Sequence, residues 1–534
     1  MISFDSLTLK AFTEENKDFL TGSRIQKIQQ PTRRDFILQI RKNGETAKLY
    51  ININPQFHHI CLMNKDNELK RRIEIPPKPP MFCMLLRKHL ENAVISKVNQ
   101  PENERIVEFY IETYNELNEK IYLCLTIELM GKHSNVILYN SDTGIILGCA
   151  HNVGAEKSRE REVAGTLPYI YPPKQRKTNI KEHSGNINYN TLSKDFYLFS
   201  DYFAKLCKGK PLNTLIKYTE LTDIMPAVSA DYSEYSLYSE LLTNECVPQK
   251  NVNEMIDNYY AHHQEKLKFE QLKSHLQTLT AQKLKRTRNS LTKINTQLTK
   301  ENDAEKFRQW ADLIMANLYT GKDFLTEIEV FDWYNNQQIK IPLDNSKTLK
   351  DNANKYYKLY NKSKTSKEKL NELKEELSNL YSYFEQIAYS LNIAADYEDL
   401  AEIKPELITE ENNKESKKKA SCKAIEPEKI TKKEYTIYIG KNNRQNDYIV
   451  SKLSKDDDLW FHTKDCAGSH VLLKGENPPE NLILECAQLA KKYSSGSNSS
   501  KIGVIYTKRK YLRKPPKANL GYVTYRNEKE IIID

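Results

Sequence analysis

Hydrophobic and polar positions alternate in short runs over the first 180 residues, which is typical of strands with one buried face. The runs predict strands at residues 24–29, 36–40, 47–53, 105–112, 121–128 and 135–139. Between them, PPKPP opens a stretch of helical spacing at residues 81–90, with an apolar face of Met81, Met84, Leu85 and Leu86. Residues 1–180 are therefore predicted to form an α+β module.

The spacing becomes helical after this module. Short segments such as 201–207 and 233–242 are separated by prolines and predict a helical hairpin unit over residues 181–258. Two long stretches follow, with leucines and other apolar residues at three-four spacing from Phe269 to Leu298 and from Leu370 to Leu391. These predict an antiparallel coiled-coil arm over residues 259–405, with a small strand-like insert at 327–342. Such an arm, with about 40 residues per helix, spans roughly 60 Å.

The pattern of apolar residues is lost in ENNKESKKKASCKAIEPE, which is charged and predicts a flexible linker over residues 406–430. A compact module of short strands and helices then follows over residues 431–534. The predicted fold class is thus multidomain α+β, with an arm of two long helices between two α+β modules.

Composition narrows the class of protein further. In 534 residues, 39% are hydrophobic, and apolar runs fall short of the roughly 18 residues of a membrane span. The N-terminal MISFDSLTLKAF lacks the pattern of a signal peptide, and the nine cysteines include no C-x-x-C pair. We expect a soluble cytoplasmic protein with free thiols, no metal or other cofactor, and no membrane partner.

The net charge of +10 is modest, and its distribution is more informative than its total. The stretch KIGVIYTKRKYLRKPPK, residues 501–517, has seven basic residues, no acid, and two interleaved tyrosines. Cations suit phosphates and aromatic rings suit bases, so the stretch predicts nucleic-acid contact over the alternative of a solvated surface strand. The candidate contacts in this stretch are Lys508, Arg509, Lys510 and Arg513.

A second cluster is DLWFHTKDCAGSHVLL, residues 458–473. Its two histidines match no standard zinc spacing, and nothing around Cys466 resembles an oxyanion hole, so neither a metal site nor nucleophilic catalysis is expected. We expect Trp460 and Phe461 to be core residues. The core interpretation does not explain why Lys464 and two histidines, His462 and His470, lie in one loop.

Five candidate binding residues, at three places in the first module, also have an ordinary structural explanation. Arg87 lies on the helix at 81–90, where a solvated polar face is as good an explanation. Lys132 and His133 lie in a tight turn between two strands. Glu104 and Arg105 stand at the entry to a strand, where a structural ion pair is the default interpretation.

Taken in order, ten segments resemble the NFACT proteins, the family of ribosome quality control. They are FDS, PPMFCMLLRKHLENA, NERIVEFYI, ELMGKHSNVILYN, REVAGTLPYIYPP, IPLDNSKTLKDNANKYYKLY, GKNNRQND, DDLWFHTKDCAGSHVLL, CAQLAKKYSSGSNSSK and VIYTKRKYLRKPPKA. The resemblance covers nearly the whole chain and is weakest between residues 181 and 260. There, KGKPLNTL replaces a more glycine-rich turn.

The resemblance implies an N-terminal domain with a fold like that of DNA glycosylases, a helix-hairpin-helix unit, a coiled-coil arm and a small α+β RNA-binding domain. It also implies that the protein binds stalled 50S subunits carrying peptidyl-tRNA, through 23S rRNA and the stalk region. The recruited tRNA would be alanyl-tRNA, and the nascent chain would receive a template-free C-terminal tail. The protein would be no enzyme, because the ribosome makes the peptide bonds.

The family's acidic-arginine pair for tailing falls on Glu104 and Arg105, and its early aspartate falls on Asp5. Bacterial members more often have Asp-Arg, and the extra methylene moves the charge by about 1.5 Å. Arg87, Lys132 and His133 are the neighbouring basic candidates at the tRNA. In the C-terminal domain the resemblance implies RNA contact by Asn443, Arg444, Gln445 and Asn446 of the GKNNRQND segment. It implies the same for the polar members of the 458–473 cluster, namely His462, Lys464, Ser469 and His470.

Other functions are weaker interpretations. Glycosylases of this fold use an N-terminal proline and usually a cysteine zinc finger, whereas this chain begins Met1-Ile2-Ser3, so glycosylase activity is not expected. A fibronectin-binding surface adhesin is one alternative, with fibronectin as its partner. A general RNA-binding scaffold is another, although a long arm favours a partner of ribosomal size.

Overall fold

The computed structural model describes residues 2, 4–101, 103–115, 117–156, 158, 160–300, 304–319, 322–408, 426–432, 434–516 and 518–533. The chain divides into two compact units, Met1–Lys268 and Phe269–Asp534. Most of the linker predicted at 406–430 lies outside the described residues. Within them, none of the helices is long and apolar enough to cross a membrane.

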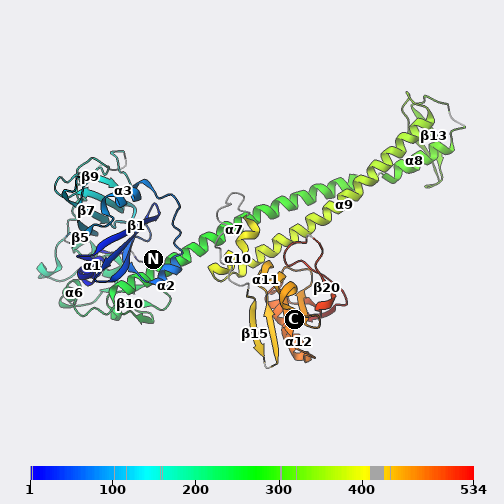
Figure 1. Ribbon diagram of the computed structural model, residues 1–534. Helices are drawn as coiled ribbons and strands as arrows, with labels where there is room; N and C mark the ends of the chain where they lie inside the picture. The colour runs from blue at the N-terminus through cyan, green and yellow to red at the C-terminus, as the bar shows by residue number, and fades with distance from the viewer. Residues whose placement is uncertain are drawn as a thin grey trace. The chain divides into compact units, whose positions relative to one another are not determined.

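The first unit is built on a nine-stranded antiparallel sheet in the order β4-β3-β2-β1-β5-β6-β7-β8-β9. Helices α1 (Ser6–Leu20) and α3 (Met81–Leu90) pack on it (Figure 1). All six predicted strands are confirmed. The strands are β1 (Arg24–Thr32), β2 (Asp35–Lys42), β3 (Glu45–Asn52), β4 (His59–Met63), β5 (Val94–Asn99), β6 (Ile106–Tyr114), β7 (Lys120–Glu128), β8 (Asn135–Asn140) and β9 (Ile146–Cys149).

Helix α3 has the predicted bounds, and of its predicted apolar face the leucines Leu85 and Leu86 are confirmed while the two methionines are wrong. The buried residues are Cys83, Leu86 and Leu90, whereas Met81 is 91% exposed and Met84 is 51% exposed. The inward row has i, i+3, i+7 spacing, and the methionines lie on the other side of the helix.

Residues 181–258 are only partly helical. Helices α4 (Leu192–Asp195), α5 (Asp201–Leu206) and α6 (Leu212–Thr219) confirm the first half. The helix predicted at 233–242 is wrong, because this segment contains strand β11 (Tyr235–Ser236) and the 3-10 turn η3 (Ser239–Leu241). β11 pairs with β10 (Ala227–Ser229), which also pairs with β12 (Cys246–Pro248). The glycosylase-like fold and the helix-hairpin-helix assignment stay predictions.

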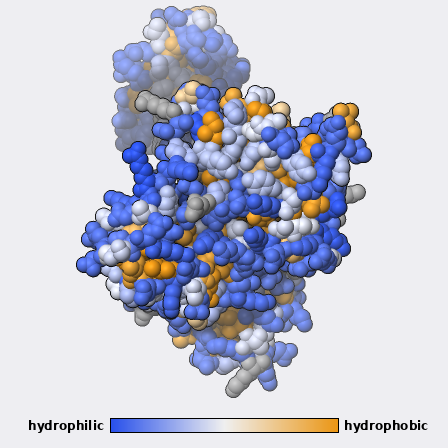
Figure 2. Space-filling model, turned by 90° about the vertical axis from the view of Figure 1, so that its left-hand side faces the viewer, coloured by the Kyte–Doolittle hydropathy of each residue, from blue (hydrophilic) through white to orange (hydrophobic). Residues whose placement is uncertain are grey.

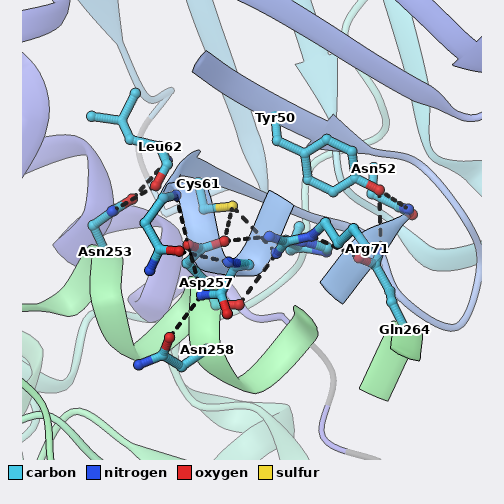
Figure 3. Close-up of polar contacts among 12 residues, drawn as sticks. Tyr50, Asn52, Cys61, Leu62, Arg71, Asn253, Asp257, Asn258 and Gln264 are labelled. Carbon is cyan, nitrogen blue, oxygen red and sulfur yellow. Dashed lines mark hydrogen bonds and ion pairs between the residues drawn. The ribbon is translucent and has the colours of Figure 1, made fainter. Parts of the chain in front are cut away.

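Helix α7 (Val252–Lys300) begins in the first unit, where a buried polar network fixes its first turns (Figure 3). Arg71 of helix α2 (Lys65–Arg71) forms an ion pair with Asp257 at 2.5 Å, and both side chains are 1% exposed. Arg71 Nε also donates to Gln264 Oε1 at 2.8 Å. Asp257 Oδ2 accepts from Asn64 N and from Asn67 Nδ2, each at 2.9 Å. The start of the helix is therefore held by specific polar contacts as well as by apolar packing.

In the second unit, α7 and α9 (Leu349–Ile393) run side by side and antiparallel (Figure 1). Lys273 Nζ donates to Asn392 O at 3.2 Å, and further along α7 Lys283 lies over the Phe384 ring. The predicted antiparallel pairing is confirmed here. The two helices share a core with α10 (Tyr397–Leu407). Leu276 comes from α7, Phe384, Ile387 and Leu391 come from α9, and Leu400, Ile403 and Leu407 come from α10.

At the far end of the paired helices, α8 (Ala304–Ala316) packs on α9 (Figure 1). The predicted insert is confirmed as a hairpin of β13 (Glu327–Asp332) and β14 (Gln337–Pro342). Phe331, Trp333 and Tyr334 on this hairpin are exposed. The arm therefore ends in a tip that presents aromatic side chains.

The C-terminal module is a six-stranded antiparallel sheet in the order β15-β16-β18-β17-β19-β22. Alternate residues of β17 (Leu459–Thr463) face opposite sides. Phe461 packs with helix α12 (Glu480–Lys492), whereas Trp460 packs with Val450 and Leu512. Trp460 and Phe461 are confirmed as core residues. The other strands are β15 (Glu428–Lys432), β16 (Tyr435–Ile439), β18 (Val471–Lys474), β19 (Ile502–Lys508) and β22 (Lys529–Ile533).

Candidate functional sites

Asp5 is the N-cap of α1. Its Oδ1 accepts from Thr8 N at 2.8 Å and from Thr8 Oγ1 at 2.7 Å, and its Oδ2 accepts from Ser200 Oγ at 2.7 Å. These bonds satisfy donors at the helix N-terminus and tie the helix to the segment before α5. Asp5 is thus fixed in place, and it lines a cavity of about 500 Å³.

Arg105 lines that cavity and a second one of about 610 Å³, which also contains His58 and Gly131. Burial lowers the pKa of Arg105, against the opposing effect of the Asp5 and Glu104 carboxylates. Burial also lowers the pKa of Lys177 in the first cavity, with repulsion from Arg105 adding to it. A cationic cleft of this kind can hold phosphate or carboxylate groups.

The other predicted residues of the first unit are spread around this cleft. Glu104 Oε2 accepts from Gln175 Nε2 at 3.3 Å. Lys132 and His133 are exposed in the 3-10 turn η1 (Gly131–His133), which confirms the predicted turn between β7 and β8. Arg87 is different, because its Nε donates to Ile28 O at 2.8 Å and so ties α3 to β1.

Sequence patterns missed two members of this site. His58 is buried beside the second cavity, and its Nε2 has no hydrogen-bond partner among the described residues. Burial, and then the charge of Arg105, lower its pKa. Lys177 lies in the irregular segment before α4 and carries no local motif. The histidine pair in QFHHICLM was the one available signal for His58.

The second unit contains a cavity of about 430 Å³ between α9 and the C-terminal module. Three ring side chains of the 458–473 cluster line it. Trp460 and His462 are parallel, with 5.8 Å between ring centroids, and His470 is perpendicular to both. Gln386 of α9 reaches the same place and accepts from Gly468 N at 2.7 Å.

The expected contact of Ser469 and His470 with RNA stays a prediction, but neither side chain lies on the outer surface of the module. Both are buried, at 1% and 4% exposure, because residues 468–470 pass beneath α9 and next to the helix α11 (Asn443–Tyr448). Lys464 is exposed and is paired with Glu530 at 3.0 Å. Within the described residues, no three or more His, Cys, Asp or Glu side chains lie close enough together to hold a metal ion.

The GKNNRQND segment has a structural partner that the sequence did not indicate. Asn443 Nδ2 donates to Glu406 Oε2 at 3.0 Å, and Gln445 Nε2 donates to Glu402 Oε2 at 2.9 Å. Asn446 Oδ1 accepts from His470 N at 3.0 Å. All three side chains are buried, and those of Asn443 and Gln445 fasten the module to α10, while their contact with RNA stays a prediction. Arg444, between them, is half-buried.

The basic stretch at 501–517 also meets acids from elsewhere in the chain. Lys508 and Lys510 both donate to Asp457 Oδ1, at 3.0 and 3.2 Å, and Lys514 pairs with Asp447. Arg509 turns inward, where its Nε donates to Val450 O at 2.8 Å. Arg513 is exposed. The four candidates are therefore one exposed arginine, two exposed lysines that share one carboxylate, and one arginine bonded within the module, and their contact with RNA stays a prediction.

Acidification is expected to destabilise the C-terminal module. Burial lowers the pKa of His462 and, with the charge of His462 added, lowers the pKa of His470 well below its ordinary value of 6.5. Above about pH 6.5 the two histidines are mostly neutral in both the folded and the unfolded chain. Below this pH the histidines of the unfolded chain bind protons that those of the folded module do not, so the folded module loses stability. Urea unfolding of a Trp310→Phe, Trp333→Phe variant, followed by Trp460 fluorescence, should show a loss of up to about 1.4 kcal/mol from His470 between about pH 7.5 and 5.5, and a smaller loss from His462. Equal stability at both values would contradict this.

The fold and these sites define a modular α+β protein with an arginine-lined cleft in one unit and a basic module with an aromatic cavity in the other. Residues 5–424 match the NFACT N-terminal and middle domains, and residues 428–527 match the NFACT protein RNA binding domain. The chain belongs to the NFACT family, and the resemblance identified from its motifs is confirmed.

Curated relatives extend over the whole chain. The "Rqc2 homolog RqcH" of Bacillus subtilis is 30% identical, with 100% of this chain and 98% of the relative covered. The protein of the same name from Streptococcus pneumoniae is 31% identical, with 99% and 97% covered. The "Archaeal Rqc2 homolog aRqcH" of Methanocaldococcus jannaschii is 24% identical over 59% of this chain and 51% of its own length.

Two solved structures are also similar. The N-terminal part of the fibronectin/fibrinogen-binding protein from Streptococcus suis is 27% identical, covers 49% of this chain and 100% of its own, and has a TM-score of 0.43. The fibrinogen binding protein from Staphylococcus aureus is 24% identical, covers 48% and 99%, and has a TM-score of 0.40.

Proposed function

We propose that the protein is a cytoplasmic ribosome quality control factor. It binds 50S subunits that carry a stalled peptidyl-tRNA, recruits alanyl-tRNA and directs template-free C-terminal tailing of the nascent chain. The observation that carries this proposal is the 30% identity to a protein named "Rqc2 homolog RqcH" over essentially the full length of both chains.

Two features of the structure support a positioning role. The cleft around Arg105 brings three cations, Arg105, Lys177 and Lys205, and two carboxylates, Asp5 and Asp201, to a cavity of about 500 Å³, where the cations can contact a phosphate. The 45 residues of α9 correspond to an arm of about 68 Å, which ends in the exposed aromatics of the hairpin. We infer that the cleft holds tRNA, that the tip contacts the stalk region of 23S rRNA, and that the ribosome performs the chemistry.

Purification of the tagged protein from cells, followed by sequencing of bound RNA, tests this function. We expect 23S rRNA together with one enriched tRNA, that of alanine. Recovery without RNA would overturn the proposal. Fibronectin binding remains the alternative, and retention on immobilised fibronectin without RNA recovery would favour it.

Removing the carboxylate of Asp457 is expected to strengthen RNA binding. The exposed Asp457 accepts from Lys508 and Lys510, so Asp457→Asn releases two cations to compete for phosphates. We expect affinity for a short RNA to rise by about three- to tenfold at low salt, with a steeper salt dependence. Glu528→Gln, at an exposed position of the same module, removes a charge without releasing these lysines and serves as the control. Equal affinities of both variants would contradict the expectation.

A further inference from the structure

We propose that the cavity between α9 and the C-terminal sheet binds the base of an unstacked nucleotide in single-stranded RNA. The cavity lies wholly within the second unit and has a volume of about 430 Å³. This is within the range of about 300–1,000 Å³ that is usual for sites of small organic groups. A single base with its sugar is a group of this kind.

The walls of the cavity suit a flat ring. Trp460, His462 and His470 form its floor, and Tyr522 and Tyr525, each 38% exposed, stand at its rim. Proteins that bind single-stranded nucleic acid stack bases on aromatic side chains. Trp460 itself is 1% exposed, so the ring faces open to a base are those of Tyr522 and Tyr525.

The electrostatics favour a base over a phosphate. The charged residues that line the cavity are Glu385 and Asp465, and no lysine or arginine belongs to its lining in the described part of the chain. Both histidines are neutral near pH 7, because burial lowers their pKa values. A phosphate would meet two carboxylates and no cation in this lining, whereas the amino groups of a base can donate to carboxylates.

Polar atoms around the cavity are left without partners in the protein. Trp460 Nε1, His470 Nδ1 and Gln386 Nε2 are buried and make no hydrogen bond among the described residues. Buried donors and acceptors are normally satisfied, so such atoms indicate an absent partner. Because these atoms are buried, the edge of a base, which carries both donors and acceptors, reaches them only after a shift of the side chains that cover them.

The phosphates of the same strand have a place outside the cavity. Strand β20 (Leu512–Arg513) pairs with β21 (Thr524–Tyr525), so that Leu512 faces Tyr525 and Arg513 faces Thr524. Arg513 is exposed, and so is Arg526, the residue after Tyr525 at the rim. A base can therefore enter the cavity while its neighbouring phosphates contact these arginines.

A plug at the mouth of the cavity tests the assignment. Ser382 is exposed on α9 and lines the cavity, so Ser382→Phe blocks the mouth without disturbing a buried contact. Ser378→Phe, one turn earlier on the same helix and outside the lining, is the matched control. Full-length variants are titrated with fluorescein-labelled hexauridylate and hexaadenylate, and adenosine and ribose 5-phosphate are used as competitors.

We expect Ser382→Phe to weaken oligonucleotide binding by about tenfold or more and Ser378→Phe to leave it unchanged. In the background with Trp460 as the single tryptophan, the oligonucleotide and adenosine should quench fluorescence and ribose 5-phosphate should not. Equal binding by both variants, or competition by ribose 5-phosphate alone, would overturn the proposal. Tighter binding of free adenosine than of either oligonucleotide would overturn the assignment to RNA.

This inference requires that the module bind RNA, and it does not require that the RNA be ribosomal. The two proposals therefore fail separately. Absence of 23S rRNA from purified complexes leaves the oligonucleotide titration intact, and equal binding by the two phenylalanine variants leaves ribosome association intact.

Discussion

Replacing Glu104 and Arg105 together by alanine is expected to abolish tailing while leaving association with the large subunit unchanged. Arg105 lines the two cavities described in the first unit. It interacts electrostatically with the carboxylates of Asp5 and Glu104 and with the ammonium group of Lys177. Loss of a partly buried charge that contacts a phosphate or a hydroxyl costs about 2–5 kcal/mol. We therefore expect the rate of tailing to fall about 100-fold or more.

The measurement is the mobility of peptidyl-tRNA on gels after reconstituted tailing, beside cosedimentation with 50S subunits. Arg41→Ala, at an exposed position of β2, removes a positive charge elsewhere in the same unit and should leave both readouts unchanged. Arg105→Lys keeps the charge but loses the planar fork, so it should retain only part of the activity. Tailing at the normal rate in the double alanine variant would contradict the assignment of this pair.

The sequence was most informative where structure depends on local period. Alternation predicted the strands at 24–29 and 121–128, and three-four spacing predicted the antiparallel helices, because burial on one face leaves a periodic trace. It failed at 233–242, where buried tyrosines and leucines have helical spacing but β11 pairs with β10 instead. A tertiary pairing there overrides the local propensity.

The site residues show a different limit. Asn443 and Gln445 were assigned to RNA because they are polar and lie in a family motif, but their partners are Glu406 and Glu402 on α10. Lys508 likewise meets Asp457, about fifty positions earlier in the chain. Such partners leave no periodic signal, so a run of residues can suggest a charged surface but cannot indicate which charges are already neutralised.

Asp257→Ala is expected to cause the largest loss of stability of any single change in the first unit. Asp257 and Arg71 are an ion pair with both side chains at 1% exposure. Removing one partner leaves a buried charge uncompensated, which costs about 3–5 kcal/mol. Urea unfolding and hydrogen exchange of the first turns of α7 should both report the loss. Asp66→Ala, at an exposed position in the first turn of α2, is the control and should cost no more than about 1 kcal/mol.

A double replacement separates the charge from the other contacts of the carboxylate. Arg71→Met with Asp257→Leu removes both charges, and a buried pair replaced by apolar groups is often neutral in stability. Here recovery should be partial, because Asn64 N and Asn67 Nδ2 also donate to Asp257 and would lose their acceptor. A double variant as stable as the unchanged protein would show that these two bonds contribute nothing. A double variant no better than Asp257→Ala would show that the loss comes from the hydrogen bonds and not from the unpaired arginine.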